Sequence, residues 1–299
     1  MKNDLLEKGA IVQRDRENYA IAPHLVGGLV TPDQLRKLAD VAEKYNAQAV
    51  KVTAAQRIAL VGIAEENIDN AWADLGMKAG AAVGLCVRSV KICPGTSFCK
   101  RGLQDSVGIG AQLDELFHGK SLPNKLKMGV SGCPNSCGDS HTRDIGIIGG
   151  GKGWMVVVGG KGGAKPRLGD RIALSVSNDK IISFVEKIVD VYENNAEKKE
   201  RLGTVLYNLA EALRFASVLL SAFLPSTSEK INAQLNITTT SWDSLSGFDG
   251  TTPGTEVKKG EALFPRIDVA KTLEELEAMR LAQIEANKPK EEYKMQPIK

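Results

Sequence analysis

The sequence predicts an α+β fold made of three consecutive parts. Residues 1–77 alternate between strand-like and helix-like apolar patterns. Residues 78–195 contain all five cysteines and the highest density of glycine, which is typical of a backbone shaped around a ligand. From residue 196 onward, apolar residues recur at helical spacing. We therefore expect domains at 1–77, 78–195 and 196–299.

The first part has a recognisable order of elements. Residues 18–28 predict a short strand, residues 48–63 predict two strands around a kink, and residues 65–77 predict an amphipathic helix. Another helix is expected over 31–45, with Thr31 as the N-cap, Pro32 at the first position and Gln34 completing a capping box. The resulting β-α-β-β-α order is typical of half a ferredoxin-like sandwich. Because this unit is small, we expect it to pack on another part of the chain.

The second and third parts predict both element types. A helix is expected over 98–117, a strand in "KLKMGVSG", a hairpin from "RDIGIIGG" and "GWMVVVGG", and a helix over 178–195. In the third part, two helices are expected on either side of a break at Pro225, with Ser226 and Glu229 as a capping box for the second. A charged helix should follow "ALFPRID".

Composition narrows the class of protein. The N-terminal "MKNDLLEKGAIVQRDRENY" lacks the apolar core of a secretory signal, and no apolar run reaches membrane-spanning length. Five cysteines are too few for a disulfide scaffold in a chain of this size. The formal net charge of +3 predicts no strong attraction for nucleic acid. We expect a soluble, cytoplasmic protein whose thiols bind metal.

Four cysteines form two close pairs, Cys93-x5-Cys99 and Cys133-x3-Cys137. Four soft ligands suit an iron–sulfur cluster or a structural zinc ion, although zinc sites favour gaps of two to four residues. Four buried cysteines without a ligand are the remaining alternative. Cys86 belongs to neither pair and is best interpreted as a small apolar core residue.

The text around these pairs resembles the short, single-repeat members of the siroheme-dependent nitrite and sulfite reductases over roughly residues 15–195. The motifs are "VKVTAAQRIALVGI", "LPNKLKMGVSGCPNSCG" and "GWMVVVGGKGGAKPRLGD". The resemblance implies that the four cysteines hold a 4Fe–4S cluster, with Cys137 also bridging to the siroheme iron. It implies six-electron reduction of sulfite to sulfide or of nitrite to ammonia.

Basic residues follow from the same resemblance, because siroheme carries many carboxylates and the substrate is an anion. It implies four catalytic residues, Lys125, Lys127, Arg88 and Lys51. It further implies cofactor-binding roles for Arg57, Arg101, Arg143, Lys161, Lys165 and Arg167. Lys125 and Lys127 alternate on one predicted strand and should share a face. For each of these residues the alternative is a solvated surface charge, and for the glycine-rich run 159–170 it is an exposed hairpin turn.

Two features predict partners, and the spacing of the histidines argues against a further metal site. Full-length family members contain two copies of this architecture and this chain contains one, so we expect a homo-oligomer. The sequence shows no G-x-G-x-x-G pattern and no P-loop, so electrons should come from an external ferredoxin or flavoprotein. The histidines His24, His118 and His141 have no metal-ligand spacing and are expected to be structural.

The C-terminal part resembles another family. Over about residues 204–285, "LYNLAEALRFASVLLSAFLPSTSEKINAQLNI", "WDSLSGF" and "ALFPRID" resemble the end of the anticodon-binding domain of bacterial methionyl-tRNA synthetases. No signature of the aminoacylation domain is present, so synthetase activity is excluded. We expect a structural or dimerising appendage. The alternatives for the whole chain are a non-catalytic siroheme or iron–sulfur carrier and a tRNA-associated binding module.

Overall fold

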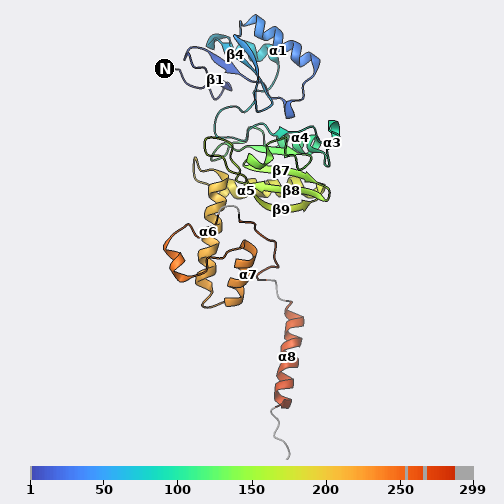
Figure 1. Ribbon diagram of the computed structural model, residues 1–299, viewed down its shortest axis with the longest axis vertical. Coiled ribbons are helices and arrows are strands. Elements are labelled where there is room, and N and C mark those ends of the chain that lie inside the picture. Colours follow the sequence, from blue (N-terminus) through green and yellow to red (C-terminus); the bar gives the residue numbers. More distant parts are fainter. Residues whose placement is uncertain (1, 253–254, 265–267, 287–299) are drawn as a thin grey trace, which may run out of the picture. The chain divides into compact units, whose positions relative to one another are not determined.

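The computed structural model describes residues 2–252, 255–264 and 268–286. The chain divides into two units, residues 1–259 and 260–299 (Figure 1), and each is described by itself. The α+β class predicted from the sequence is confirmed, with two sheets and their helices in the first unit. The boundaries expected at residues 77 and 195 stay predictions.

The N-terminal sheet has the order β1-β2-β4-β3 and is antiparallel throughout. Its strands are β1 (Ala10–Val12), β2 (Tyr19–Ile21), β3 (Ala49–Val52) and β4 (Ile58–Ile63). Helices α1 (Pro32–Lys44) and α2 (Ile68–Leu75) share one apolar core with the sheet. The predicted capping box of α1 is present, because the Thr31 hydroxyl accepts from the Gln34 N–H and the Gln34 amide oxygen accepts from the Thr31 N–H. Strand β1 was not predicted.

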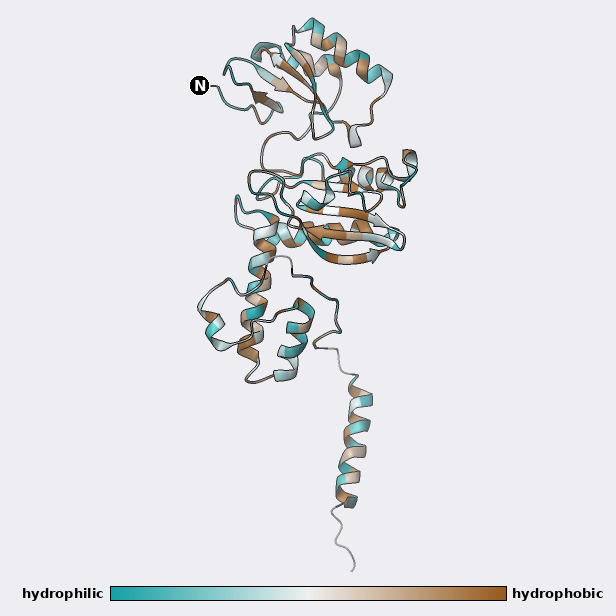
Figure 2. Cartoon of the chain, viewed as in Figure 1, coloured by the Kyte–Doolittle hydropathy of each residue, from teal (hydrophilic) through white to brown (hydrophobic). Residues whose placement is uncertain are grey.

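The second sheet has the order β5-β6-β7-β8-β9. Strands β5 (Lys91–Ile92), β6 (Met128–Ser131) and β7 (Ile145–Gly150) are parallel to one another, whereas β8 (Gly153–Val158) and β9 (Asp170–Val176) continue antiparallel. Strands β6 to β8 are mostly hydrophobic (Figure 2) and lie in the core with helix α5 (Asn178–Asn195). The hairpin and α5 were predicted; β5 and β9 were not.

The single helix predicted over 98–117 is wrong. The chain instead forms a short helix α3 (Gly95–Phe98) and a separate helix α4 (Ser106–Phe117). A side chain at Gly102 would lie 2.5 Å from the Gly95 carbonyl carbon, so the chain turns back here at close range. Asp105 then caps α4 by accepting from the Gly108 N–H at 2.9 Å.

Two further helices, α6 (Leu202–Leu220) and α7 (Pro225–Leu235), complete the first unit together with the turn Trp242–Ser246. The predicted break at Pro225 is confirmed, but the capping box is wrong: α7 begins at Pro225, and its N-cap Leu224 makes no side-chain hydrogen bond. Proline suits this first position because its missing N–H would have no helical partner. The second unit contains helix α8 (Val269–Ala286).

In the part of the chain that the structure describes, no helix combines the length and the apolar character needed to cross a bilayer.

Candidate cofactor and anion site

The two cysteine loops start side by side. Strands β5 and β6 are parallel neighbours, with Ile92 opposite Val130. Cys93 directly follows β5, and Cys133 follows β6 after one glycine. Because the carboxyl ends of parallel strands meet at one edge of a sheet, the topology brings the first cysteine of each pair to the same place.

Gly132 joins the two loops through its backbone. Its N–H donates to the Cys93 Sγ at 3.1 Å, and its carbonyl accepts from the Leu103 and Gln104 N–H groups at 2.8 and 3.0 Å. A side chain at Gly132 would lie 2.6 Å from the Gln104 oxygen and 2.8 Å from the Gly95 Cα. Only glycine therefore permits this approach.

The four cysteines differ in exposure. Cys93 is buried, Cys99 and Cys133 are half-buried, and Cys137 is exposed. Among the described residues, no three His, Cys, Asp or Glu side chains converge to hold one metal ion. A structural zinc ion needs four donors around a single centre, whereas in a 4Fe–4S cluster each cysteine binds its own iron.

The end of the second cysteine loop is fixed by buried and charged contacts. The Gly138 N–H donates to the Ser131 hydroxyl at 2.9 Å. Asp139 accepts from the Lys91 Nζ at 2.6 Å and from the Arg143 Nη2 at 2.9 Å. The hydrogen bond from Lys91 lowers the pKa of Asp139, and Arg143 adds to this effect. Lys91 and Asp139 were not predicted; their pairing depends on the fold.

Lys125 and Lys127 flank Leu126, which is fully buried, while Lys125 is exposed and Lys127 half-buried; that the two lysines share a face stays a prediction. They precede β6, however, while the cysteines follow it, and the four residues of β6 span about 13 Å. The Lys127 N–H donates to Asp144 at 2.8 Å. Burial lowers the pKa of the Lys127 ammonium, and the charges of Arg143 and Lys125 lower it further.

A basic group surrounds the buried carboxylate of Asp144. Arg201 pairs with Asp144, and both line a 320 Å³ pocket together with Lys161 and Arg167. The backbones of Lys161 and Arg167 bond to each other at 2.9 and 2.8 Å, which forms a hairpin. Arg167 also donates to the Gly159 carbonyl and pairs with Asp170. The structure thus brings Lys161 and Arg167 together beside Asp144, the carboxylate that also accepts from the Lys127 backbone, and leaves Lys165 exposed in the turn.

Arg57 and Arg88 form a second basic group, between the N-terminal sheet and the segment before β5. Arg88 donates to the carbonyls of Ala81 and Gly84 at 2.8 and 2.9 Å. The Arg57 Nε and Nη1 are buried and have no hydrogen-bond partner among the described residues. Burial lowers the pKa of both guanidinium groups, and for Arg57 the charge of Arg88 adds to it.

The remaining two predicted cationic residues are Lys51 and Arg101. Lys51 is exposed on the edge strand β3, and Arg101 is exposed in the loop that follows Cys99.

Gln56, in the turn between β3 and β4, is hydrogen-bonded to strand β5, which precedes Cys93. The sequence did not reveal this role. The Gln56 amide donates to the Ile92 carbonyl at 2.7 Å and accepts from the Ile92 N–H at 2.8 Å. Because Ile92 immediately precedes Cys93, the amide holds Arg57 close to the first cysteine loop.

Two histidines add contacts between the N-terminal part of the chain, helix α4 and the segment before β5. The rings of His24 and His118 stack at 3.6 Å, and the His24 Nε2 lies 2.6 Å from Asp114. Asp114 also accepts from the Val90 N–H at 2.8 Å. Burial, then the nearby His24, lowers the pKa of His118 to about 4. These contacts give both histidines structural partners.

The chain offers donors that suit an acidic tetrapyrrole. Buried donor atoms without a partner among the described residues occur on Arg57, on Arg143 and on Ser136, which lies between Cys133 and Cys137. Buried donors of this kind normally find acceptors. A cofactor with several carboxylates would supply them beside the cysteine loops, so the residues present fit such a group.

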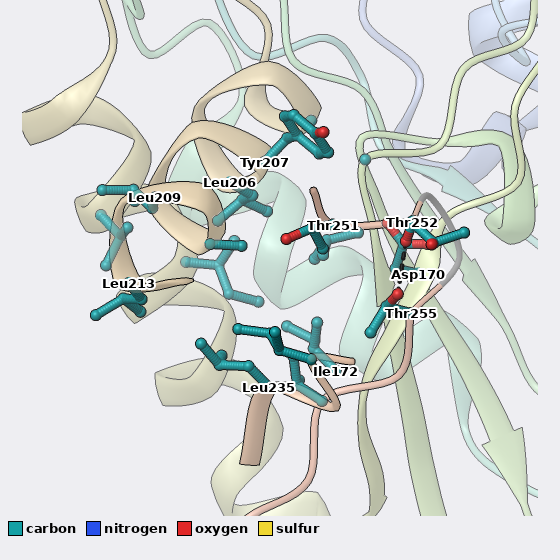
Figure 3. Close-up of a pocket in the computed structure, with 18 of the residues that line it drawn as sticks. Asp170, Ile172, Leu206, Tyr207, Leu209, Leu213, Leu235, Thr251, Thr252 and Thr255 are labelled. Atoms are coloured by element: carbon teal, nitrogen blue, oxygen red, sulfur yellow. Dashed lines mark hydrogen bonds between the residues drawn. The ribbon is translucent and has the colours of Figure 1, made fainter. Parts of the chain in front are cut away.

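A separate cavity of 390 Å³ lies between β9, α5, α6 and α7. Figure 3 shows Ile172, Leu206, Leu209, Leu213 and Leu235 around it, with threonine hydroxyls on one side. Of the predicted site residues only Arg167 lines this cavity, and none of the cysteines does. Its aliphatic lining suits apolar contacts and does not suit an oxyanion.

Comparison with known proteins decides the family. The sequence model of the nitrite and sulphite reductase 4Fe-4S domain matches residues 83–215, and that of the nitrite/sulfite reductase ferredoxin-like half domain matches residues 11–78. An assimilatory-type sulfite reductase of Nitratidesulfovibrio vulgaris is 43% identical over 210 residues, covering 70% of this chain and 96% of the relative. This chain belongs to the nitrite and sulphite reductase family. Its cofactors are therefore a siroheme and a 4Fe–4S cluster.

Two further similarities complete the comparison. The crystal structure of dissimilatory sulfite reductase I has a TM-score of 0.57 at 13% identity, covering 85% of this chain and 74% of that one, which shows a shared fold. A methionine–tRNA ligase of Clostridium acetobutylicum is 54% identical over 124 residues, 40% of this chain but 18% of the ligase. This reductase chain thus also contains a segment similar to part of a ligase.

Replacing Gly132 by alanine is expected to empty the cluster site. The new methyl group would force the two cysteine loops apart and break the bond to the Cys93 Sγ. Iron and acid-labile sulfide per protein should fall to a small fraction of wild type. Gly151→Ala is the matched control, because nothing lies within 4 Å of its Cβ position. Full iron content in the Gly132 variant would contradict the expectation.

Proposed function

We propose that this reductase converts sulfite to sulfide. The observation that carries the proposal is its similarity to a sulfite reductase over nearly the whole length of that relative. In this reaction sulfite takes up six electrons and seven protons and leaves as hydrosulfide and three waters. Nitrite, reduced by six electrons to ammonia, is the alternative substrate, because both oxyanions suit a cationic site.

Cys93, Cys99, Cys133 and Cys137 are proposed to hold the cluster, and Cys137 to bridge to the siroheme iron. Their positions support this: the first pair starts beside the second, and Cys137 is the exposed member that an external group can reach. When bound, the coupled cofactors supply electrons and an iron position for the oxyanion. The protein supplies the cage, the positive charge and the protons.

Arg57 and Arg88 are proposed to bind anionic groups, and Lys127 to supply protons. The unpartnered donors of Arg57 support an acceptor that the protein lacks. A lysine whose pKa is lowered gives up its proton more readily, which suits Lys127. Lys125 and Lys51 remain proposed catalytic residues, and Arg101, Arg143, Lys161, Lys165 and Arg167 remain proposed cofactor ligands.

We also propose a homo-oligomer and an external electron donor in a cytoplasmic setting. The edge strand β3 supports association, since all four of its residues are exposed and the apolar Val50 and Val52 are 53% and 71% exposed. Light scattering of the holoprotein should give a mass of at least two chains, and a monomer would contradict this. The segment from about residue 204 to 285 is proposed as a structural extension similar to the end of a synthetase anticodon-binding domain.

Turnover with reduced methyl viologen tests the function. Anaerobically purified holoprotein should show siroheme absorption bands and reduce sulfite with a higher kcat/KM than nitrite. A higher kcat/KM for nitrite would reverse the choice of substrate. Cofactor-loaded protein that turns over neither would favour the non-catalytic carrier.

Replacing Arg57 by glutamine is expected to weaken siroheme binding without lowering the thermal stability of the apoprotein. Loss of the guanidinium removes hydrogen bonds to an anionic group, about 1–3 kcal/mol, so siroheme affinity should fall roughly 10- to 100-fold. The apoprotein should keep or gain thermal stability, because a half-buried charge with two unpartnered donor atoms disappears. Siroheme titration and thermal unfolding of the apoprotein measure the two effects. Arg36→Gln, at an exposed site on α1, is the control.

A further inference from the structure

We propose that Ser106 sets the reduction potential of the iron–sulfur cluster through Cys93. This inference rests on the proposed role of Cys93 as a cluster ligand. Ser106 is fully buried, and its hydroxyl lies 3.3 Å from the Cys93 Sγ and 2.8 Å from the Cys93 carbonyl. Ser106 is thus a positioning residue that acts on the cluster through one ligating sulfur.

Cys93 has a special need for donors, because it is the buried cysteine of the four proposed ligands. A thiolate held away from water is costly unless hydrogen-bond donors surround it. The Gly132 N–H supplies one donor at 3.1 Å. The Ser106 hydroxyl donates its single proton to the Cys93 carbonyl at 2.8 Å and lies 3.3 Å from the Sγ, so a rotation about its C–O bond turns that proton to the sulfur as the second donor. Ser106 is also the first residue of α4, whose positive N-terminal end therefore lies close to the same sulfur.

The surrounding structure fixes the hydroxyl in place. A side chain at Gly95 would lie 2.2 Å from the Ser106 Oγ, so glycine at this position leaves room for it. Farther along α4, Asp114 is bonded to the Val90 N–H and lies against His24. Helix α4 is therefore anchored at both ends to the segment that carries Cys93.

The direction of the effect follows from charge. Reduction places one electron on the cluster, with no bond formed or broken and no proton moved. Donors to a ligating sulfur stabilise the more negative, reduced state more than the oxidised state, and so raise the potential. Removing the hydroxyl should make reduction less favourable.

The test is a potentiometric titration of the cluster in the holoprotein, followed by electron paramagnetic resonance. In Ser106→Ala the equilibrium constant for reduction should fall about tenfold, which is about 59 mV for one electron. Ser106→Cys, with a weaker donor, should shift it less in the same direction and serves if the alanine variant fails to hold a cluster. Ser140→Ala is the matched control, because its buried hydroxyl bonds to Ser131 and to the Gly129 carbonyl but to no sulfur.

The outcomes separate this inference from the proposed function. An unchanged potential in a cluster-loaded Ser106 variant, or an equal shift in Ser140→Ala, overturns the inference alone. A cluster that survives in the Cys93→Ala variant would instead remove the ligand assignment on which the inference rests.

Discussion

Replacing Cys137 by serine is expected to release siroheme from the protein and abolish sulfite reduction. Cys137 is the exposed cysteine in the loop fixed by Gly138 and Asp139, and it is the proposed link between the cluster and the siroheme iron. A hydroxyl is a poor replacement for a soft thiolate ligand. The absorption bands of siroheme should disappear from the purified variant, and its iron content should fall.

Cys86→Ser provides the control for this experiment, because Cys86 lies outside both pairs and bonds to the Val83 carbonyl. It should retain both cofactors. If the Cys137 variant kept the wild-type spectrum and activity, the bridging assignment would be wrong.

Replacing Arg214 by alanine is expected to open the helical end of the first unit. Arg214 and Glu211 are fully buried on α6, with the Arg214 Nη2 2.9 Å from Glu211. Arg214 also donates to the Ser244 hydroxyl and the Gly247 carbonyl, which fasten the turn after α7. Leaving the buried Glu211 charged without its cationic partner costs about 3–5 kcal/mol. Amide hydrogen exchange at residues 242–250 should accelerate by about 100-fold or more.

Arg36→Ala is the matched control, since Arg36 and Asp33 form a pair of the same spacing in full solvent exposure. Its effect should stay below about 1 kcal/mol. Equal effects of the two variants would refute the argument from burial.

The pair also gives a pH dependence. Burial opposes ionisation of Glu211, but hydrogen bonds from Arg214 and the Gly250 N–H outweigh it and lower the pKa of Glu211 to about 2. The stabilisation should be fully present above pH 4.5 and disappear as the pH falls towards 2. Hydrogen exchange at residues 242–250 across this range measures it.

Elements whose start or end is determined by residues adjacent in the sequence were predicted correctly, whereas elements determined by distant contacts were missed. Thr31, Pro32 and Gln34 indicated the start of α1 because a cap acts within one helical turn. Strand β5 was missed because its two residues show no alternation and are defined by pairing with β6, far along the chain. The helix break at Gly102 was missed because a glycine also occurs inside helices, and here contact with Gly95 decides.

The features of the candidate site likewise include some that sequence spacing indicates and others that depend on long-range contacts. The cysteine spacings indicated a cluster, and the family match supports that cofactor. Leu126 between Lys125 and Lys127 is buried, while the distance of the two lysines from the cysteines depends on the length of β6. The contacts of Gln56, Lys91 and Ser106 join segments 13 to 48 residues apart, so no local pattern could reveal them.

Helix α6 runs unbroken from Leu202 to Leu220, and the family match ends inside it at residue 215. Leu202 and Val205 pack in the core of the cysteine-bearing sheet, while Arg214 packs with the turn after α7. An α-helix advances about 100° per residue. Inserting a single residue between these two contacts would therefore turn the extension about 100° around the helix axis, whereas inserting seven, close to two full turns, would nearly restore its direction. The number of α6 residues between these two contacts therefore sets the direction in which the segment after Arg214 leaves the helix.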